Sequence, residues 1–165
     1  MRKNWAISVC VFDLMVTESE RGYPEETCGL LFGSNDTLEV VPMENVQNQL
    51  HAKDPVANPR DATTAFQFDS LAFDNTLRQK ESQGLEFRAI YHSHPDHEAY
   101  FSEKDRADAA PPGWGPLYPD VIHIVFSIKK GKLADHKGFA WSKEQEDFVE
   151  LTVERSDDTR LSSGG

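Results

Sequence analysis

The sequence predicts a single domain of the α/β (α+β) class, built on a mixed sheet. The length of 165 residues suits one domain, and a hydrophobic content of 38% is enough for a compact core. Apolar runs typical of strands alternate with segments of helical spacing, and turn signals join some of the strands as hairpins. No internal repeat is visible.

The first half of the chain combines buried strands with one helix and a long loop. In order, we expect a strand over residues 5–12, a helix over 14–21, and strands over 26–32 and 38–43. Gly22 and Pro24 end the helix, because proline is poorly tolerated inside one. The turn cluster at 33–36 closes a hairpin. Residues 44–64 are polar and proline-containing, so we expect no regular structure there.

The second half repeats the alternation of strands and helices. In order, we expect a short strand over 65–68, a helix that Asp69 or Ser70 caps and Gly84 ends, a strand over 87–91, a helix over 103–110, and strands over 121–128 and 133–141. Leu71, Phe73, Leu77 and Lys80 have the spacing of one helix face. We therefore expect the domain to span residues 1–145, with a charged helix or flexible tail over 146–165.

The charge of the chain restricts its partners. With 17 Lys and Arg against 28 Asp and Glu, the formal net charge is −11. Such a surface repels phosphate backbones, so nucleic-acid binding is not expected, and a basic partner or a cation is favoured. No apolar run has the length of a membrane span, and the N-terminal stretch lacks the cleavage site of a signal peptide. A cytoplasmic protein that does not enter the membrane is expected.

Two cysteines, Cys10 and Cys28, exclude a disulfide framework, and no CxxC pair is present for a structural zinc or a redox site. Both lie in apolar runs. We therefore expect both to be buried, unreactive thiols.

The segment His92-Ser93-His94-Pro95, followed by Ser102-x-x-Asp105, carries the strongest chemical signal. In extended backbone, residues i and i+2 point to the same face, so the two imidazoles can reach one metal ion. Asp105 at the start of the next helix can return a carboxylate to complete the site. Two nitrogens and one oxygen suit zinc, and three protein ligands leave a fourth position for water, as in catalytic sites.

Each part of this pattern has a structural alternative. Ser102-x-x-Asp105 also fits a capping box at a helix start, and an isolated His-x-His pair is more often a surface or core feature than a metal site. His97-Glu98 does not begin an HExxH zinc helix, because the fourth residue after His97 is Phe101. The remaining histidines, which have no metal-ligand spacing and are expected to be structural or exposed, are His51, His123 and His136.

An upstream segment, Glu26-Thr27-Cys28-Gly29-Leu30-Leu31-Phe32-Gly33, distinguishes between these alternatives. Together with His-x-His-Pro, six further residues and Ser-x-x-Asp, it resembles the JAMM (MPN-plus, JAB-domain) zinc metallopeptidases, and the compact form resembles their prokaryotic branch. The resemblance covers roughly residues 23–141. It implies a single MPN/JAB-type domain with a mixed, mostly antiparallel sheet flanked by helices.

The resemblance also implies a role for each motif residue. His92, His94 and Asp105 would hold one Zn²⁺ ion with water as the fourth ligand. Glu26 would be the general base, and Ser102 would donate a hydrogen bond to the oxyanion of the tetrahedral intermediate. No covalent intermediate is needed, so Cys28 is expected to pack under the site rather than to act as a nucleophile.

The activity implied by the resemblance is isopeptidase or peptidase cleavage after the C-terminal glycine of a ubiquitin-like protein. An alternative is the processing of a sulfur-carrier protein by removal of a cysteine or a short C-terminal extension; either partner would present a Gly-Gly tail. A metal-free MPN scaffold and a structural zinc domain are further alternatives, disfavoured by the complete ligand set and by the open coordination position. Residues 44–64 and 111–119 are candidate partner contacts, although the aromatic residues of the second loop, Trp114 and Tyr118, also suit local packing.

The last residues, Ser162-Ser163-Gly164-Gly165, themselves resemble a ubiquitin-like tail. The simpler interpretation is a flexible terminus or an artificial extension. The sharper hypothesis is that this segment occupies an active site as a product mimic.

Overall fold

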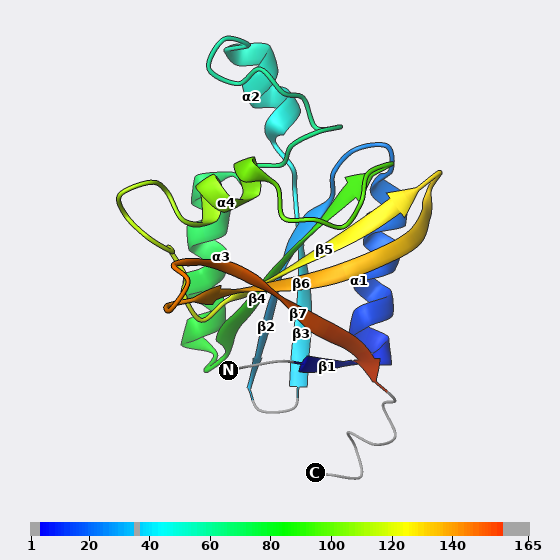
Figure 1. The fold of residues 1–165 in the computed structure, drawn as a ribbon, viewed down its shortest axis with the longest axis vertical. Coiled ribbons are helices and arrows are strands. Elements are labelled where there is room, and N and C mark those ends of the chain that lie inside the picture. Colours follow the sequence, from blue (N-terminus) through cyan, green and yellow to red (C-terminus); the bar gives the residue numbers. More distant parts are fainter. Residues whose placement is uncertain (1–3, 35–36, 157–165) are drawn as a thin grey trace.

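A computed structural model describes residues 4–34 and 37–156 of the chain (Figure 1). The segment Ser162–Gly165, for which a product-mimic role was considered, lies outside the described residues.

One mixed sheet of seven strands forms the centre of the described residues (Figure 1). The strands are β1 (Asn4–Ser8), β2 (Cys28–Ser34), β3 (Thr37–Met43), β4 (Glu86–Pro95), β5 (Ile122–Lys129), β6 (Lys132–Ser142) and β7 (Asp147–Ser156). Their spatial order is β1-β7-β6-β5-β4-β2-β3. The β1–β7 and β4–β5 pairs are parallel, and the other four pairs are antiparallel. The expected α+β class and mostly antiparallel sheet are confirmed.

One face of the sheet is covered by α1 (Val9–Gly22). Phe12 and Met15 of this helix pack on a buried cluster that includes Tyr91 of β4 and Phe126 of β5. The aromatic rings of Phe12 and Phe126 meet edge to face, with centroids 5.6 Å apart. This face is mostly apolar, with the His136 ring packed among the aromatic side chains, and it provides the main hydrophobic stabilisation of the sheet.

The opposite face of the sheet carries α3 (Ser70–Ser82) and α4 (Glu103–Ala109), and α2 (Gln47–Lys53) lies beyond one end of the sheet in the view of Figure 1. Asp69 begins α3 by accepting a hydrogen bond from the Ala72 amide at 2.9 Å, as expected from its capping position. Within the described residues, no helix is both long and apolar enough to cross a membrane.

The expected helix or tail after residue 145 is wrong for residues 147–156, which form β7 between β6 and β1. Leu151 and Val153 are buried, whereas the residues that alternate with them, Glu150, Thr152 and Glu154, are exposed. This alternation is the period of a half-buried strand. The high charge of the segment obscured the pattern, although its charged side chains are all exposed.

The first strand is shorter than expected, and the apolar run continues as a helix. The side chain of Ser8 accepts a hydrogen bond from the Val11 amide and so begins α1 at Val9. This change of structure places Cys10 at an exposed position, contrary to expectation, whereas Cys28 is buried as expected.

Two expectations for residues 44–68 are also wrong. Residues 47–53, expected to be irregular, form α2, a helix too short to show apolar periodicity. Residues 65–68, expected to be a strand, pair with no strand, because the Gln67 amide donates to the side chain of Asn45 instead. On α3, Phe73 and Leu77 pack as expected, whereas Leu71 is exposed at the first turn.

The position of β7 predicts how the protein responds to truncated side chains. Leu151→Ala removes a buried side chain between the sheet and α1, and we expect it to lower the free energy of unfolding by about 2–5 kcal/mol. Thr152→Ala, on the exposed side of the same strand, is the matched control and should change it far less. Urea denaturation measures the free energy of unfolding of both variants. Equal effects would contradict the packing of β7 as part of the central sheet.

Candidate metal centre and active site

Strand β4 carries both histidines of the predicted site. The strand continues to Pro95, four residues beyond the expected end, and pairs on both sides, with β2 and with β5. His92 and His94 therefore lie on the same face of the sheet, the face that α3 and α4 cover, and both are buried. Tyr91, which points to the other face, anchors the strand in the core under α1.

Helix α4 brings Asp105 to these imidazoles. The Ser102 hydroxyl accepts a hydrogen bond from the Asp105 amide at 3.0 Å, and Asp105 Oδ2 accepts one from the Ser102 amide at 3.1 Å. The structure thus contains the capping box that was considered as an alternative. The same Oδ2 atom lies 3.2 Å from His92 Nε2 and 3.4 Å from His94 Nε2. The cap therefore holds the carboxylate at the imidazoles rather than competing with that arrangement.

The donor atoms of His92, His94 and Asp105 form a compact triangle. The two Nε2 atoms are 3.1 Å apart, and each lies within 3.4 Å of Asp105 Oδ2. Ligands placed about 2.0–2.1 Å from a tetrahedral ion would be separated by about 3.3 Å. The triangle therefore has the size that a zinc ion requires, and one face of it is left without a protein donor from these three residues.

The hydrogen bonds around the imidazoles favour an ion at this point. His94 Nδ1 lies 2.9 Å from the carbonyl oxygen of Glu98, which can only accept, so Nδ1 carries the proton and Nε2 keeps its lone pair. Phe66 stacks on the His92 ring with centroids 4.5 Å apart. Burial alone would raise the pKa of Asp105, but His92 and His94 lower that pKa below its usual range. The carboxylate is thus an anion beside two imidazoles, a set that fits a divalent cation.

Glu26 lies next to this triangle, just before β2. It is buried, and one of its carboxylate oxygens lies within 4.8 Å of a ring nitrogen of each histidine. Asp105 Oδ2 is nearer to both imidazoles, at 3.2 and 3.4 Å, but the Glu26 carboxylate and the two imidazoles are also close enough together to hold a metal ion. Burial raises the pKa of Glu26, although His92 and His94 act in the opposite direction.

Asn45, which the sequence did not single out, ties Glu26 to the loop above the site. Its Nδ2 donates to the carbonyl oxygens of Glu26 at 2.9 Å and Ala65 at 3.1 Å. Its Oδ1 accepts from the amides of Gln47 at 3.0 Å and Gln67 at 3.1 Å. All four hydrogen-bonding positions of the amide are therefore used. An asparagine in a polar loop has no local pattern that would reveal this role.

Cys28 and Gly29, the small residues that follow Glu26 in β2, allow close packing of β2 against β4. Cys28 pairs with His92 in the sheet, and burial raises the pKa of its thiol to about 12. Such a thiol is not a nucleophile at neutral pH. A Cβ atom on Gly29 would lie 2.4 Å from the ring of Tyr91, so glycine lets β2 approach the strand that carries the histidines.

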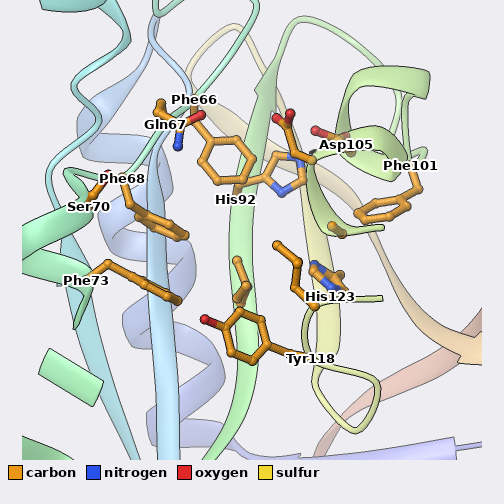
Figure 2. A pocket seen from close by; sticks show the side chains of 14 residues that line it. Phe66, Gln67, Phe68, Ser70, Phe73, His92, Phe101, Asp105, Tyr118 and His123 are labelled. Carbon is orange, nitrogen blue, oxygen red and sulfur yellow. Dashed lines mark hydrogen bonds and ion pairs between the residues drawn. The ribbon is translucent and has the colours of Figure 1, made fainter. Parts of the chain in front are cut away.

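A cavity of about 250 Å³ adjoins the triangle (Figure 2). Phe66, Phe68 and Phe73 lie on one side of it, and Phe101 and His123 lie on the other. His92 and Asp105 are part of its lining, so the cavity opens directly beside the candidate metal ligands.

Three other histidines and Trp114 lie apart from the triangle, whereas His123 and Tyr118 line the adjoining cavity. His51 Nδ1 pairs with the Asn58 carbonyl oxygen, His136 Nε2 pairs with the Val153 carbonyl oxygen, and His97 is exposed. In the loop over 111–119, Tyr118 packs against Phe73 and Phe87, whereas Trp114 is 85% exposed.

Two curated proteins are similar in sequence. The chain is 29% identical over 130 residues to a desampylase from Haloferax volcanii, which covers 79% of this chain and 78% of the relative. It is 35% identical over 89 residues to a probable TtuB-protein conjugate cleaving protease from Thermus thermophilus. That match covers 54% of this chain and 52% of the relative, so it spans about half of each protein.

Solved structures share the fold. Protein DSY2949 from Desulfitobacterium hafniense aligns with a TM-score of 0.65 and 18% identity, over 94% of this chain and 97% of that one. A protein from Salinibacter ruber aligns with a TM-score of 0.57 and 20% identity, over 91% of both chains. The JAB1/MPN domain protein AF2198 from Archaeoglobus fulgidus aligns with a TM-score of 0.50 and 18% identity, over 91% of this chain and 97% of that one. The family model for prokaryotic homologs of the JAB domain matches residues 8–142, a range that contains β2, β4, α4 and every residue of the triangle, and the chain belongs to this family.

Proposed function

We propose that this protein is a zinc-dependent isopeptidase that cleaves the amide bond after the C-terminal glycine of a ubiquitin-like protein. The observation that carries the proposal is the buried triangle of His92, His94 and Asp105 with Glu26 beside it. The names of the two similar proteins, a desampylase and a conjugate cleaving protease, support a cleavage reaction on protein conjugates.

In this proposal, His92 and His94 through Nε2 and Asp105 through Oδ2 hold the zinc ion. When bound, the ion would lower the pKa of a coordinated water to about 7 and polarise the scissile carbonyl. The chain contributes the orientation of the donors: the Glu98 carbonyl fixes the tautomer of His94, and the Ser102 amide fixes the Asp105 carboxylate.

In this proposal, Glu26 transfers a proton from the attacking water to the leaving amine. Its carboxylate accepts a proton from the attacking water and then delivers it to the nitrogen of the leaving amine. Burial favours this role because the raised pKa of Glu26 makes its carboxylate a better proton acceptor. Asn45 holds the backbone of Glu26 in place, and the hydrogen bond from the Glu26 amide to the Ala62 carbonyl at 2.7 Å adds a second restraint.

Ser102 stabilises the charge that develops on the carbonyl oxygen. Its Oγ already accepts the Asp105 amide, so its own hydroxyl hydrogen is available to donate to the substrate. The serine therefore caps α4 and supplies the oxyanion donor with different parts of the same hydroxyl group. Loss of such a donor costs about 3–4 kcal/mol in other hydrolases.

The substrate is a ubiquitin-like or sulfur-carrier protein with a C-terminal Gly-Gly tail. A glycine pair suits a narrow approach to a buried site, because it adds no side chain near the imidazoles. Isopeptide conjugates and carriers with a short C-terminal extension share this tail, so a panel of both forms separates deconjugation from precursor processing.

Glu26→Gln tests the central assignment. The amide keeps the size of the side chain and cannot accept the proton, so we expect the mutant to retain zinc and to lose activity by about 10²–10⁴-fold. The assay is cleavage of a Gly-Gly-ending ubiquitin-like protein joined to the lysine ε-amine of a labelled peptide, with zinc measured by elemental analysis.

Glu25→Gln is the matched control for this experiment, because Glu25 is the exposed neighbour and pairs with Asn48 away from the triangle. It should retain activity. Unchanged turnover in Glu26→Gln would refute the general-base role, and loss of zinc would make Glu26 a ligand.

Replacement of a ligand should abolish metal binding itself. We expect His94→Ala to lose both zinc and activity, because two donors remain where three are needed. His97→Ala changes an exposed histidine three residues further on and should retain both. Removal of zinc from the wild-type protein with a chelator should abolish cleavage, and addition of zinc should restore it. Full activity in the chelated protein would refute the metal requirement.

Asn45→Asp tests the link between Glu26 and the loop. The change keeps the acceptor for Gln47 and Gln67 but replaces the two hydrogen bonds that Nδ2 donates with repulsion from an anion. We expect kcat to fall between about tenfold and a hundredfold, with zinc content and KM nearly unchanged. Asn75→Asp, the same change at an exposed position of α3, is the control. A fall in zinc content, or a rise in KM with no change in kcat, would contradict a role in positioning Glu26.

A further inference from the structure

The cavity beside the metal ligands contains a polar group that the proposed mechanism does not use. His123 is only 7% exposed and lies in the cavity lining. Within the part of the chain that the structure describes, neither nitrogen of its ring makes a hydrogen bond to the protein. Its ring contacts Phe101 and Phe148, with centroids 5.0 and 5.3 Å apart. The ring nitrogens are open to the cavity, so a polar group that enters it can pair with them.

The walls of the cavity are suited to an aromatic ring. The rings of Phe66, Phe68, Phe73 and Tyr118 contact one another in sequence, with centroids 5.5, 5.2 and 5.9 Å apart, and form a continuous aromatic wall. Phe101 lies opposite this wall (Figure 2). An apolar cavity of about 150 Å³ is already large enough for benzene, so about 250 Å³ accommodates one substituted ring.

The imidazole of His123 is uncharged at neutral pH, because burial lowers its pKa to about 4. A neutral imidazole has one donor and one acceptor nitrogen, which is complementary to a hydroxyl group. A buried carboxylate would find no cationic partner in this lining, which already contains the carboxylates of Asp105 and Asp108. An ammonium group is the competing occupant, which the binding experiment below tests directly.

We propose that the cavity is a subsite for a tyrosine side chain of the protein segment that enters the active site, with the phenol hydroxyl hydrogen-bonded to His123. The inference rests on the proposed function for the origin of this segment. Because His92 and Asp105 belong to the same lining, the tyrosine lies close to the bond that is cleaved, and His123 acts as a specificity-determining residue.

Binding of small ring compounds tests the subsite without any cleavage step. We expect p-cresol to bind the zinc-loaded protein about fivefold more tightly than toluene, since the two differ by one hydroxyl group and one hydrogen bond. An NMR titration that follows the side chains of the cavity gives both dissociation constants. Equal affinities, no binding, or tighter binding of n-butylammonium than of p-cresol would overturn the proposal.

Variants locate the binding site. His123→Phe should reduce the ratio of the two affinities to about one, and Ala109→Phe, at a half-buried position in the lining, should abolish binding of both rings. Trp114→Ala, exposed in the neighbouring loop and outside the lining, should bind both rings as the wild type does. Unchanged p-cresol binding in Ala109→Phe would overturn the proposal even if His123→Phe fails to fold.

A peptide series connects the subsite to the substrate. Isopeptide substrates with Tyr, Phe or Lys at each of the four positions before Gly-Gly should show a preference for Tyr over Phe at one position, and His123→Phe should remove it. Cleavage without preference at any position overturns the subsite and leaves the proposed function intact. If the ring compounds bind as expected but no substrate is cleaved, the subsite stands and the proposed function is overturned.

Discussion

One oxygen atom, Oδ2 of Asp105, is the point on which the site depends. It accepts the Ser102 amide and lies within 3.4 Å of Nε2 of both His92 and His94. The amide at a helix start is available because the first turn has no internal acceptor for it. A feature that stabilises α4 by itself therefore also fixes a carboxylate at the end of β4. Helix and strand cannot shift relative to each other without loss of the cap or separation of the donors.

This arrangement needs a rigid strand, and the sheet provides one by using its two faces differently. On β4, Ala89 and Tyr91 face the apolar layer under α1, whereas Ile90 and His92 line the cavity on the opposite face, where His94 also lies. The burial of His92, His94 and Asp105 together disfavours folding unless a ligand compensates for the hydration that these polar side chains lose. The aromatic packing of Phe12, Tyr91 and Phe126 on the other face supplies stability that does not depend on the site.

The sequence allowed prediction of those features that depend on local periodicity. His92 and His94 follow from the two-residue period of a strand, and Asp105 follows from the three-residue spacing of a helix cap. Glu26, 66 residues before His92, was identified through resemblance to a family and not from spacing. Asn45 and Phe66 could not be predicted, because their contacts come from a loop whose path is determined by tertiary hydrogen bonds.

The errors in the fold have the same physical basis. The charged residues of β7 suggested a tail. The structure shows that the segment pairs with β6 and β1 along its two edges and that Leu151 and Val153 pack in the cluster under α1. Residues 65–68 have strand composition, yet their amide groups pair with a side chain rather than with a strand. The composition of a segment indicates how exposed it is, whereas its strand pairing depends on its tertiary neighbours.

The closeness of the cavity to the donor triangle connects selection of the substrate with the chemistry. His92 and Asp105 line the cavity, and Phe66 contacts both the His92 ring and the aromatic wall. In the proposed reaction, a side chain that fills the cavity would contact Phe66, which stacks on the ring of the proposed ligand His92, and its binding energy would be realised close to the scissile bond. Binding energy realised there contributes to catalysis when it is larger in the transition state than in the ground state. The hydrogen bonds of Asn45 then serve two purposes, because they hold both Glu26 and the segment that carries Phe66 and Phe68.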